Sequence, residues 1–175
     1  MRKKVVITGL GCVTPVGLNV KETWDALIAG KSGAGLITQF DASKHKTRIA
    51  AEVKGFDGIA LFGQREARKM DRFTQFAMAS TLEAMAQAGL TVNESNRDRI
   101  GVVVGTGIGG ILTLMEQVDV MRERGPDRVS PFLIPMMISD GAVGMIAIRV
   151  GARGPNMAIA TACASGNNAI GEAGE

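Results

Sequence analysis

Apolar residues follow two patterns along the chain, and each pattern predicts one kind of element. Short runs rich in β-branched or other apolar residues predict buried strands. They lie at 3–8, 100–104 and 157–160, with a weaker edge-strand candidate at 48–53. Longer stretches in which apolar residues recur with helical spacing predict helices. They lie at 20–28, 71–88, 111–124 and 138–149, and a glycine-punctuated stretch from about Asn167 predicts a last helix.

Capping and turn residues mark the ends of several of these elements. Asn19 is followed three residues later by Glu22, a pairing typical of a helix N-cap. Gly89 ends the helix at 71–88, and Gly125 with Pro126 ends the helix at 111–124. Because helices and strands alternate without a linker or repeat, the sequence predicts one α/β domain with a mainly parallel sheet.

Composition narrows the class further. The 175 residues are 46% hydrophobic and 21% charged, which indicates a globular chain and not a disordered one. Glycine is abundant at 23 residues and aromatic residues make up only 4%, so backbone segments are expected to approach one another closely. A formal net charge of +3 does not by itself indicate a nucleic-acid partner.

The N-terminus carries a basic start, but its apolar run is too short for the core of a signal peptide. No apolar run approaches the roughly eighteen residues of a membrane span. We therefore expect a cytoplasmic protein with no membrane contact. In that compartment Cys12 and Cys163 are expected to stay reduced.

Cys163 is the strongest candidate for chemistry. In the segment MAIATACASG a predicted strand runs into this cysteine, small residues flank it, and a helical stretch follows. The free N–H groups and positive end of a helix favour a thiolate and can hold an oxyanion. These features predict an accessible nucleophile. The alternative is a small buried hydrophobic residue, the more common role of a free cysteine.

The glycine-rich loop at 105–110 has two interpretations. Gly105, Gly107 and Gly110 have the GxGxxG spacing of a dinucleotide-binding turn between a strand and a helix. No second parallel strand ending in an acidic residue follows within a short unit, as that turn requires. The spacing therefore favours close backbone packing over a nucleotide-binding domain.

A basic cluster precedes the helix at 71–88. Arg65, Arg68, Lys69 and Arg72 would share one face if the segment were helical. Four like charges on one stripe favour an acidic partner whose approach they steer. A merely solvated face is equally compatible with the residues alone.

Several motifs together resemble the β-ketoacyl-acyl carrier protein synthases, the condensing enzymes of fatty acid synthesis, and most closely their type II elongating members. The motifs extend over the whole chain. They are VVITGLGCVTPVG, RKMDRFTQFA, GVVVGTGIGG, SPFLIPMMI and GPNMAIATACASGNNAIGEA. The resemblance implies a thiolase-like fold of two similar α/β halves, of which this chain would form an incomplete N-terminal half.

The resemblance also implies roles for individual residues. Cys163 would take an acyl chain from acyl carrier protein and pass it to a carbanion formed by decarboxylation of malonyl-acyl carrier protein. The acyl pocket would include Ile108, Leu133 and Ile134, the latter two reaching across a homodimer interface. The docking patch for acyl carrier protein would include Arg65, Arg68 and Lys69. No metal or diffusible cofactor is implied.

The two catalytic histidines and the lysine of the family have no match in these 175 residues. We therefore expect a fragment of a longer protein that does not complete condensation alone. The alternative of another class is a non-catalytic, thiolase-like subunit that binds carrier protein or pairs with an intact partner.

The two remaining candidates have ordinary interpretations. The only histidine, His45, lies in the polar segment DASKHKTR and is expected to be a solvated surface residue. Cys12 is expected to be a buried structural thiol. With two cysteines and one histidine, the spacing matches no zinc site.

Overall fold

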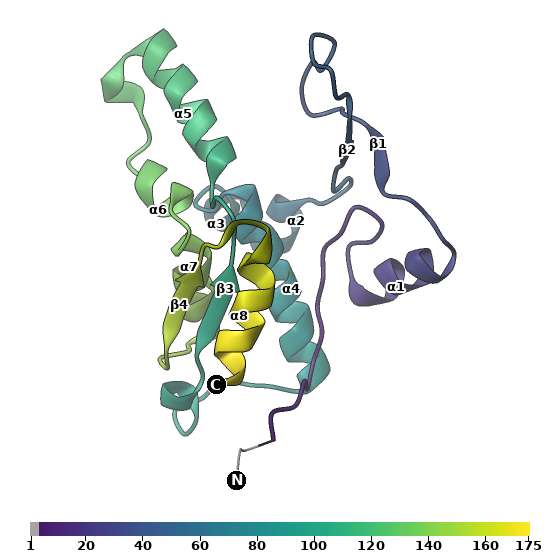
Figure 1. Cartoon of the computed structure of the whole chain (residues 1–175). Coiled ribbons are helices and arrows are strands. Elements are labelled where there is room, and N and C mark those ends of the chain that lie inside the picture. The colour runs from purple at the N-terminus through teal and green to yellow at the C-terminus, as the bar shows by residue number, and fades with distance from the viewer. Residues whose placement is uncertain (1–3) are drawn as a thin grey trace.

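The computed structural model describes residues 4–175 (Figure 1). The helices are α1 (Val20–Ile28), α2 (Gly58–Phe62), α3 (Gln64–Ala67), α4 (Arg72–Ala88), α5 (Ile111–Arg124), α6 (Leu133–Met137), α7 (Gly141–Val150) and α8 (Ser165–Gly174). The strands are β1 (Ala34–Leu36), β2 (Ile49–Ala51), β3 (Val102–Gly105) and β4 (Asn156–Ile159). Short 3-10 turns lie at Arg97–Arg99, Pro126–Arg128 and Ala162–Ala164.

The centre of the molecule is a parallel pair of strands covered by helices. β3 pairs with β4, with Val102 opposite Asn156 and Gly105 opposite Ile159. α7 contacts the pair and packs in turn on α4, while α8 lies against β3 and β4 (Figure 1). The α/β prediction is confirmed, with a sheet of two strands among the described residues.

The core lies between α4 and α7. Met70, Met78 and Ile146 are almost fully buried and form one cluster, against which Val102 and Val104 of β3 pack. Asp71 caps α4 by accepting a hydrogen bond from the Phe73 N–H at 3.1 Å. The predicted helix at 71–88 is thus confirmed, and it ends where Gly89 adopts a left-handed conformation with φ of 62°.

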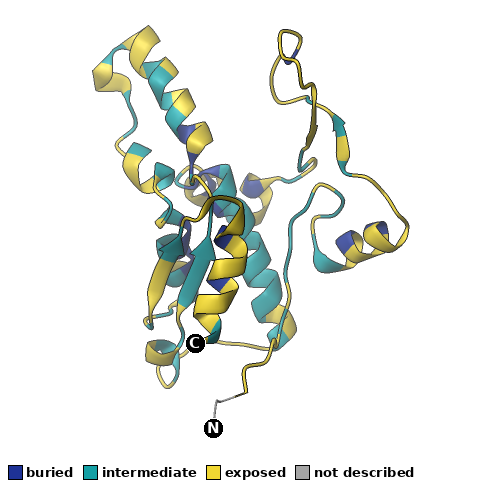
Figure 2. Cartoon of the chain, viewed as in Figure 1, coloured by how far each residue is buried: buried dark blue, intermediate teal, exposed yellow. Residues whose placement is uncertain are grey.

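The strand predicted at 3–8 is wrong for the described residues, and Lys3 lies outside them. Residues 4–13 have no strand assignment, and Val5, Val6 and Ile7 are 65%, 69% and 80% exposed (Figure 2). A β-branched run becomes a strand only when a neighbouring strand receives its backbone hydrogen bonds. Within residues 4–175 no such neighbour lies beside this run.

Residues 4–13 form an N-terminal arm, and its later residues, from Gly9 to Cys12, lie directly on α4. A β-carbon at Gly11 would clash with the backbone of Ser80. Side chains of α4 then hold the arm, since the Cys12 N–H donates to Glu83 at 3.0 Å. Glycine at this position therefore permits a close approach of the two backbones.

α1 forms as predicted but does not bury its apolar stripe. Asn19 accepts a hydrogen bond from the Glu22 N–H at 2.8 Å, which confirms the N-cap. Trp24 and Leu27 are nevertheless 61% and 57% exposed, and the buried positions are Thr23 and Ala26. After α1, β1 and β2 form a separate antiparallel hairpin, so the edge-strand candidate at 48–53 is confirmed.

Other boundaries differ by a few residues. α7 begins at Gly141 and not at 138, because Ile138 is extended where the short helix α6 ends. α8 begins at Ser165, two residues before the predicted start. Among residues 4–175, no helix has both the length and the apolar character needed to span a membrane.

Candidate functional site

The turn between β4 and α8 presents Cys163 on the surface. After β4 ends at Ile159, Ala162 adopts a left-handed conformation with φ of 50°. Such a conformation is costly for a residue with a β-carbon. Cys163 follows in a single 3-10 turn and is exposed, and α8 begins two residues later. The predicted strand-to-helix elbow is therefore present, and a buried cysteine at this position is excluded.

Side chains from both ends of the elbow hold it in this conformation. Ser165 is 3% exposed, and its hydroxyl donates to the Ala162 carbonyl at 2.7 Å and accepts the Thr161 N–H at 2.9 Å. One turn later in α8, the Asn168 amide donates to the Thr161 hydroxyl at 3.0 Å. These hydrogen bonds connect the end of β4 to the first turns of α8, so the position of Cys163 is closely constrained.

The glycine-rich loop after β3 runs beside this elbow. A β-carbon at Gly105 would clash with the Ser165 carbonyl, and one at Gly107 would lie 3.5 Å from the Ala162 carbonyl. A β-carbon at Gly110 would clash with the Met136 carbonyl. All three glycines of the GxGxxG spacing therefore face protein backbone, which favours the packing interpretation over a nucleotide site.

The same loop joins the elbow to α6. The Gly110 N–H donates to the Met137 carbonyl at 2.8 Å, at the end of the helix that carries Leu133 and Ile134. Ile108 lies at the tip of the loop and is 67% exposed; Ile134 is 57% exposed and Leu133 is half-buried. The three predicted acyl-pocket residues thus lie on two connected segments, of which the loop with Ile108 runs beside the elbow, and their roles remain predictions.

The basic cluster is arranged differently from the predicted stripe. α3 ends at Ala67 and Arg72 begins α4, so the four cations do not share one helix face. Arg65 and Arg68 are exposed, while Lys69 pairs with Glu66 at 3.0 Å. The patch at the surface therefore consists of Arg65, Arg68 and Lys69.

Arg72 is structural and does not belong to that patch. Its guanidinium donates to the Val53 carbonyl at 2.9 Å. It also lies over the rings of Phe56 and Phe76, at 5.8 and 4.8 Å from their centroids. A cation held between two aromatic rings and a carbonyl is committed to packing α4 against the preceding segment.

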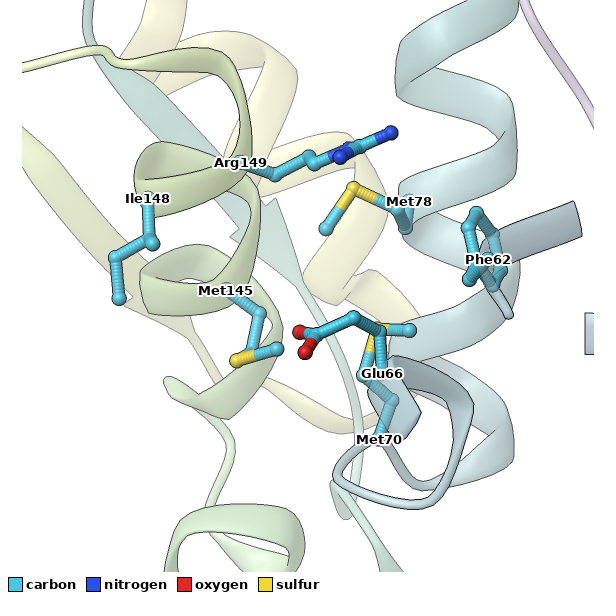
Figure 3. A pocket seen from close by; sticks show the side chains of 7 residues that line it. All are labelled: Phe62, Glu66, Met70, Met78, Met145, Ile148 and Arg149. Carbon is cyan, nitrogen blue, oxygen red and sulfur yellow. The ribbon is translucent and has the colours of Figure 1, made fainter. Parts of the chain in front are cut away.

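A cavity of about 280 Å³ lies between α2, α3, α4 and α7, away from the predicted acyl-pocket residues. Figure 3 shows Met78, Met70 and Met145 lining it, with the Glu66 carboxylate pointing inward between them. Neither Cys163 nor Ile108 lines this space, so it is separate from the elbow.

The remaining candidates have ordinary surroundings. Cys12 is half-buried and its thiol donates to the Thr23 hydroxyl at 3.4 Å, in agreement with a structural role. His45 is exposed and contacts Phe40 edge-to-face with centroids 5.5 Å apart. Across residues 4–175, no group of three or more His, Cys, Asp or Glu side chains is arranged to hold a metal ion.

Sequence reasoning missed several residues that build the site. The left-handed Ala162 has no sequence signal, since alanine is not typical of that conformation. Ser165 was recognised only as a small neighbour of Cys163, and its buried hydroxyl was not anticipated. Asp71 was recognised as a helix start, but its bond to Thr113 spans 42 residues and no local pattern reveals it.

Solved structures that share this arrangement include ketosynthases. The ishigamide ketosynthase/chain length factor aligns with a TM-score of 0.84 at 29% identity, covering 98% of this chain and 43% of that one. A type II PKS acyl-carrier protein in complex with its ketosynthase bound to the hexaketide aligns at 0.79 with 22% identity, covering 99% and 47%. This class of structures establishes the thiolase-like fold.

The family follows from the sequence itself. Residues 2–175 match the family model "Beta-ketoacyl synthase, N-terminal domain", and the chain belongs to this family. The 3-oxoacyl-[acyl-carrier-protein] synthase 2 of Synechocystis sp. is 48% identical over 172 residues. That match covers 98% of this chain and 41% of the relative, so the chain spans about two fifths of the relative's length.

Proposed function

We propose that the chain supplies the acyl-accepting half of a β-ketoacyl-acyl carrier protein synthase, an acyltransferase of fatty acid biosynthesis, with Cys163 as the nucleophile. The observation that carries this proposal is the elbow itself. Cys163 is exposed immediately before α8, and the left-handed Ala162 turns the chain so that the thiol precedes the helix start. Free N–H groups at a helix start stabilise a thiolate and a developing oxyanion.

The first step of the proposed reaction is a thioester exchange. The Cys163 thiolate attacks the carbonyl carbon of an acyl thioester, and a tetrahedral intermediate forms with its negative charge on the oxygen. Backbone N–H groups near the start of α8 stabilise that oxygen. The intermediate collapses by breaking the bond to the carrier sulfur, which leaves as a thiolate and takes up a proton.

The second step needs groups beyond those of the elbow. Decarboxylation of a malonyl thioester forms an enolate, which attacks the acyl-cysteine and releases the Cys163 thiolate. The enolate requires hydrogen-bond donors of its own. The single histidine of these residues, His45, is exposed and packs on Phe40, so we assign it no part in this step. Condensation is proposed for a longer protein that contains this chain.

Acyl carrier protein is the proposed partner. The relatives of this chain are named for it, and one similar structure is a ketosynthase in complex with such a protein. Arg65 and Arg68 present two exposed cations on and just after α3, with Lys69 beside them. Surface cations of this kind steer an acidic partner and raise its association rate.

Self-association and a cytoplasmic location complete the proposal. Ile134 on α6 is exposed, as is Phe132 next to it, and an apolar patch of this kind favours contact with a second copy. The relatives are named 3-oxoacyl-[acyl-carrier-protein] synthase 2, and the proposed cytoplasmic location rests on this similarity. Sedimentation of the chain with and without Ile134→Asp tests the first point, since a dimer that uses this face would dissociate.

Intact-mass spectrometry tests the nucleophile. The chain is incubated with tetradecanoyl coenzyme A and compared with Cys163→Ala and, as a matched control, Cys12→Ala. We expect one acyl group on the unsubstituted chain and on Cys12→Ala, and none on Cys163→Ala. The control is informative because Cys12 is half-buried and bonded to Thr23, so it lacks the exposure that reaction needs.

An unlabelled chain that is folded by circular dichroism would overturn the assignment of Cys163 as acyl acceptor. The non-catalytic carrier-protein-binding subunit would then describe the chain better. Measured affinity of that unlabelled chain for acyl carrier protein would support the non-catalytic subunit, because a binding subunit keeps this affinity without acylation.

Charge reversal tests the docking patch. Arg68→Glu combined with Lys69→Glu is expected to weaken carrier-protein affinity about tenfold or more at low salt, because attraction becomes repulsion. Arg124→Glu combined with Arg153→Glu, at exposed positions at the end of α5 and before β4, is the control with the same change in net charge. Equal affinities for both variants, measured by calorimetry, would contradict docking at this patch.

A further inference from the structure

Asp71 is a buried carboxylate between the docking segment and the glycine-rich loop. It is 5% exposed and follows Lys69 by two residues. One oxygen caps α4 through the Phe73 N–H. The other accepts both the N–H and the hydroxyl of Thr113, at 2.9 and 2.7 Å. Thr113 is also 5% exposed, so these two hydrogen bonds are shielded from water.

The bonded threonine lies in the first turn of α5, directly after the loop that carries Ile108. A β-carbon at Gly110 would lie 3.0 Å from the same Asp71 oxygen, so the loop passes against the carboxylate as well. The Gly109 N–H donates to the Thr106 hydroxyl at 3.1 Å, which closes the loop on itself. The loop is therefore a compact unit fixed to Asp71 at its end.

Three neighbours set the position of this loop. Its start packs on the elbow, where Gly105 meets the Ser165 backbone. Its far end is held by the Met137 carbonyl of α6 and by Asp71. Of these three, only Asp71 connects the loop to α4 and the segment with Arg68 and Lys69 through side-chain hydrogen bonds.

We infer that Asp71 is a positioning residue that sets acyl-chain selectivity, by fixing the loop bearing Ile108 relative to Cys163. The inference rests on the proposed function, in which Cys163 accepts the acyl group and Ile108 borders its chain. A loop shift of a fraction of an ångström changes how much room a long chain has beside Ile108, and a short chain does not reach as far. Selectivity between long and short chains is therefore the property that Asp71 controls.

The experiment compares labelling rates of Cys163 by octanoyl and tetradecanoyl coenzyme A, followed by intact-mass spectrometry. The variants are Asp71→Asn, whose single amide oxygen can accept from Phe73 or from Thr113 but not at both positions, and Thr113→Val, which keeps the side-chain shape but removes the hydroxyl. We expect Asp71→Asn to change the ratio of the two rates by about fivefold, because its NH2 group faces an N–H donor at one of the two positions. Thr113→Val is expected to change the ratio by less, since the Thr113 N–H still donates to Asp71.

Asp57→Ala is the matched control for loss of a helix cap. Asp57 caps α2 through the N–H groups of Ile59 and Ala60, at 2.9 and 3.0 Å, and does not touch the loop. We expect its rate ratio to equal that of the unsubstituted chain. A general loss of stability would lower both rates together, whereas a shifted loop changes their ratio.

Hydrogen exchange gives a second readout that needs no acylation. The Thr113 amide is expected to exchange about tenfold faster in Asp71→Asn, because its acceptor is weakened, with little change for β3. Faster exchange with an unchanged rate ratio in both variants would overturn the selectivity role while leaving Cys163 as acyl acceptor. An unlabelled but folded original chain would overturn the proposed function and the selectivity role together.

Discussion

Two β-branched runs of nearly the same composition adopt different structures in this molecule. Val102, Val103 and Val104 form β3, pair with β4 and are half-buried against the core. The run at 5–7 lies exposed on the surface and pairs with no strand within the described residues. The difference lies in their neighbours: α7 and α8 cover β3, and β4 receives its hydrogen bonds. A strand is therefore a property of a pair of segments and of what covers them.

A glycine near each of the two runs shows the same contrast between a paired and an unpaired segment. Gly105 is the last residue of β3 and lies against the Ser165 backbone. Gly11 lies in the N-terminal arm, against the backbone of Ser80 in α4. Both glycines permit close contact between backbones. At Gly105 the contact supports a strand that is paired with β4. At Gly11 the contact with α4 holds a segment that pairs with no strand among residues 4–175.

The largest effect is expected at Gly105. Gly105→Ala places a methyl group against the Ser165 carbonyl, and neither backbone has room to move without breaking the elbow. We expect a loss of on the order of 3 kcal/mol in the free energy of unfolding. Urea denaturation measures it, and Gly35→Ala in β1, with nothing within 4 Å of the added carbon, is the control.

A loss at Gly105 no larger than at Gly35 would show that the β3 contact is loose, and the contrast between the two regions would disappear. The same variant is expected to slow acylation of Cys163, because Ser165 holds the elbow through the Ala162 carbonyl.

The next effect concerns the two runs directly. Val104→Ala removes apolar contacts with the core cluster and is expected to cost about 1 kcal/mol, since the side chain is half-buried. Val6→Ala is expected to change stability by less than about 0.5 kcal/mol, because Val6 is 69% exposed. Equal losses in chemical denaturation would mean that the arm is buried in solution, for example in a dimer.

The smallest effect is a pH response outside the core. Hydrogen bonds to Glu52 from the Thr38 side chain and then its N–H hold the pKa of this carboxylate below its ordinary value of 4.5. A depressed folded-state pKa stabilises the region beside β2 above the ordinary value, and this contribution disappears as pH falls through the folded pKa. We expect the Thr38 amide resonance to shift in that acid range.

Glu52→Gln provides the comparison, since it removes the ionisable group and keeps an acceptor. Its Thr38 resonance is expected to stay constant over the same range. If both proteins titrate alike, the response belongs to another group and the Glu52 assignment is wrong.

Local signals explain how much of the fold the sequence could predict. Helices that follow a capping residue, such as α1 after Asn19 and α4 after Asp71, lie close to their predicted bounds, because capping residues act within a few positions. The strand prediction at 3–8 is wrong for the described residues because strand pairing depends on a partner that is distant in the sequence. The exposure of Trp24 and Leu27 on α1 was not predictable for the same reason, since an apolar stripe does not specify what covers it.

The site divides in the same way. The elbow at Cys163 was visible because strand, small residues and helix are consecutive in the chain. The bonds that position it are not visible, since Asp71 meets Thr113 across 42 residues and Gly105 meets Ser165 only in the folded structure. The predicted four-cation stripe is wrong because α3 ends at Ala67 and a turn separates it from α4, which begins at Arg72, whereas periodicity treats the segment as continuous.

The left-handed Ala162 makes tolerance to substitution at this position differ from what its exposure suggests. An exposed side chain ordinarily accepts most replacements. Here a β-branched residue would add to a backbone cost of about 1–2 kcal/mol, and only glycine, asparagine or aspartate would lower it. A saturation library at this surface position is therefore expected to retain few residues, and the restriction would arise from the backbone and not from any contact of the side chain.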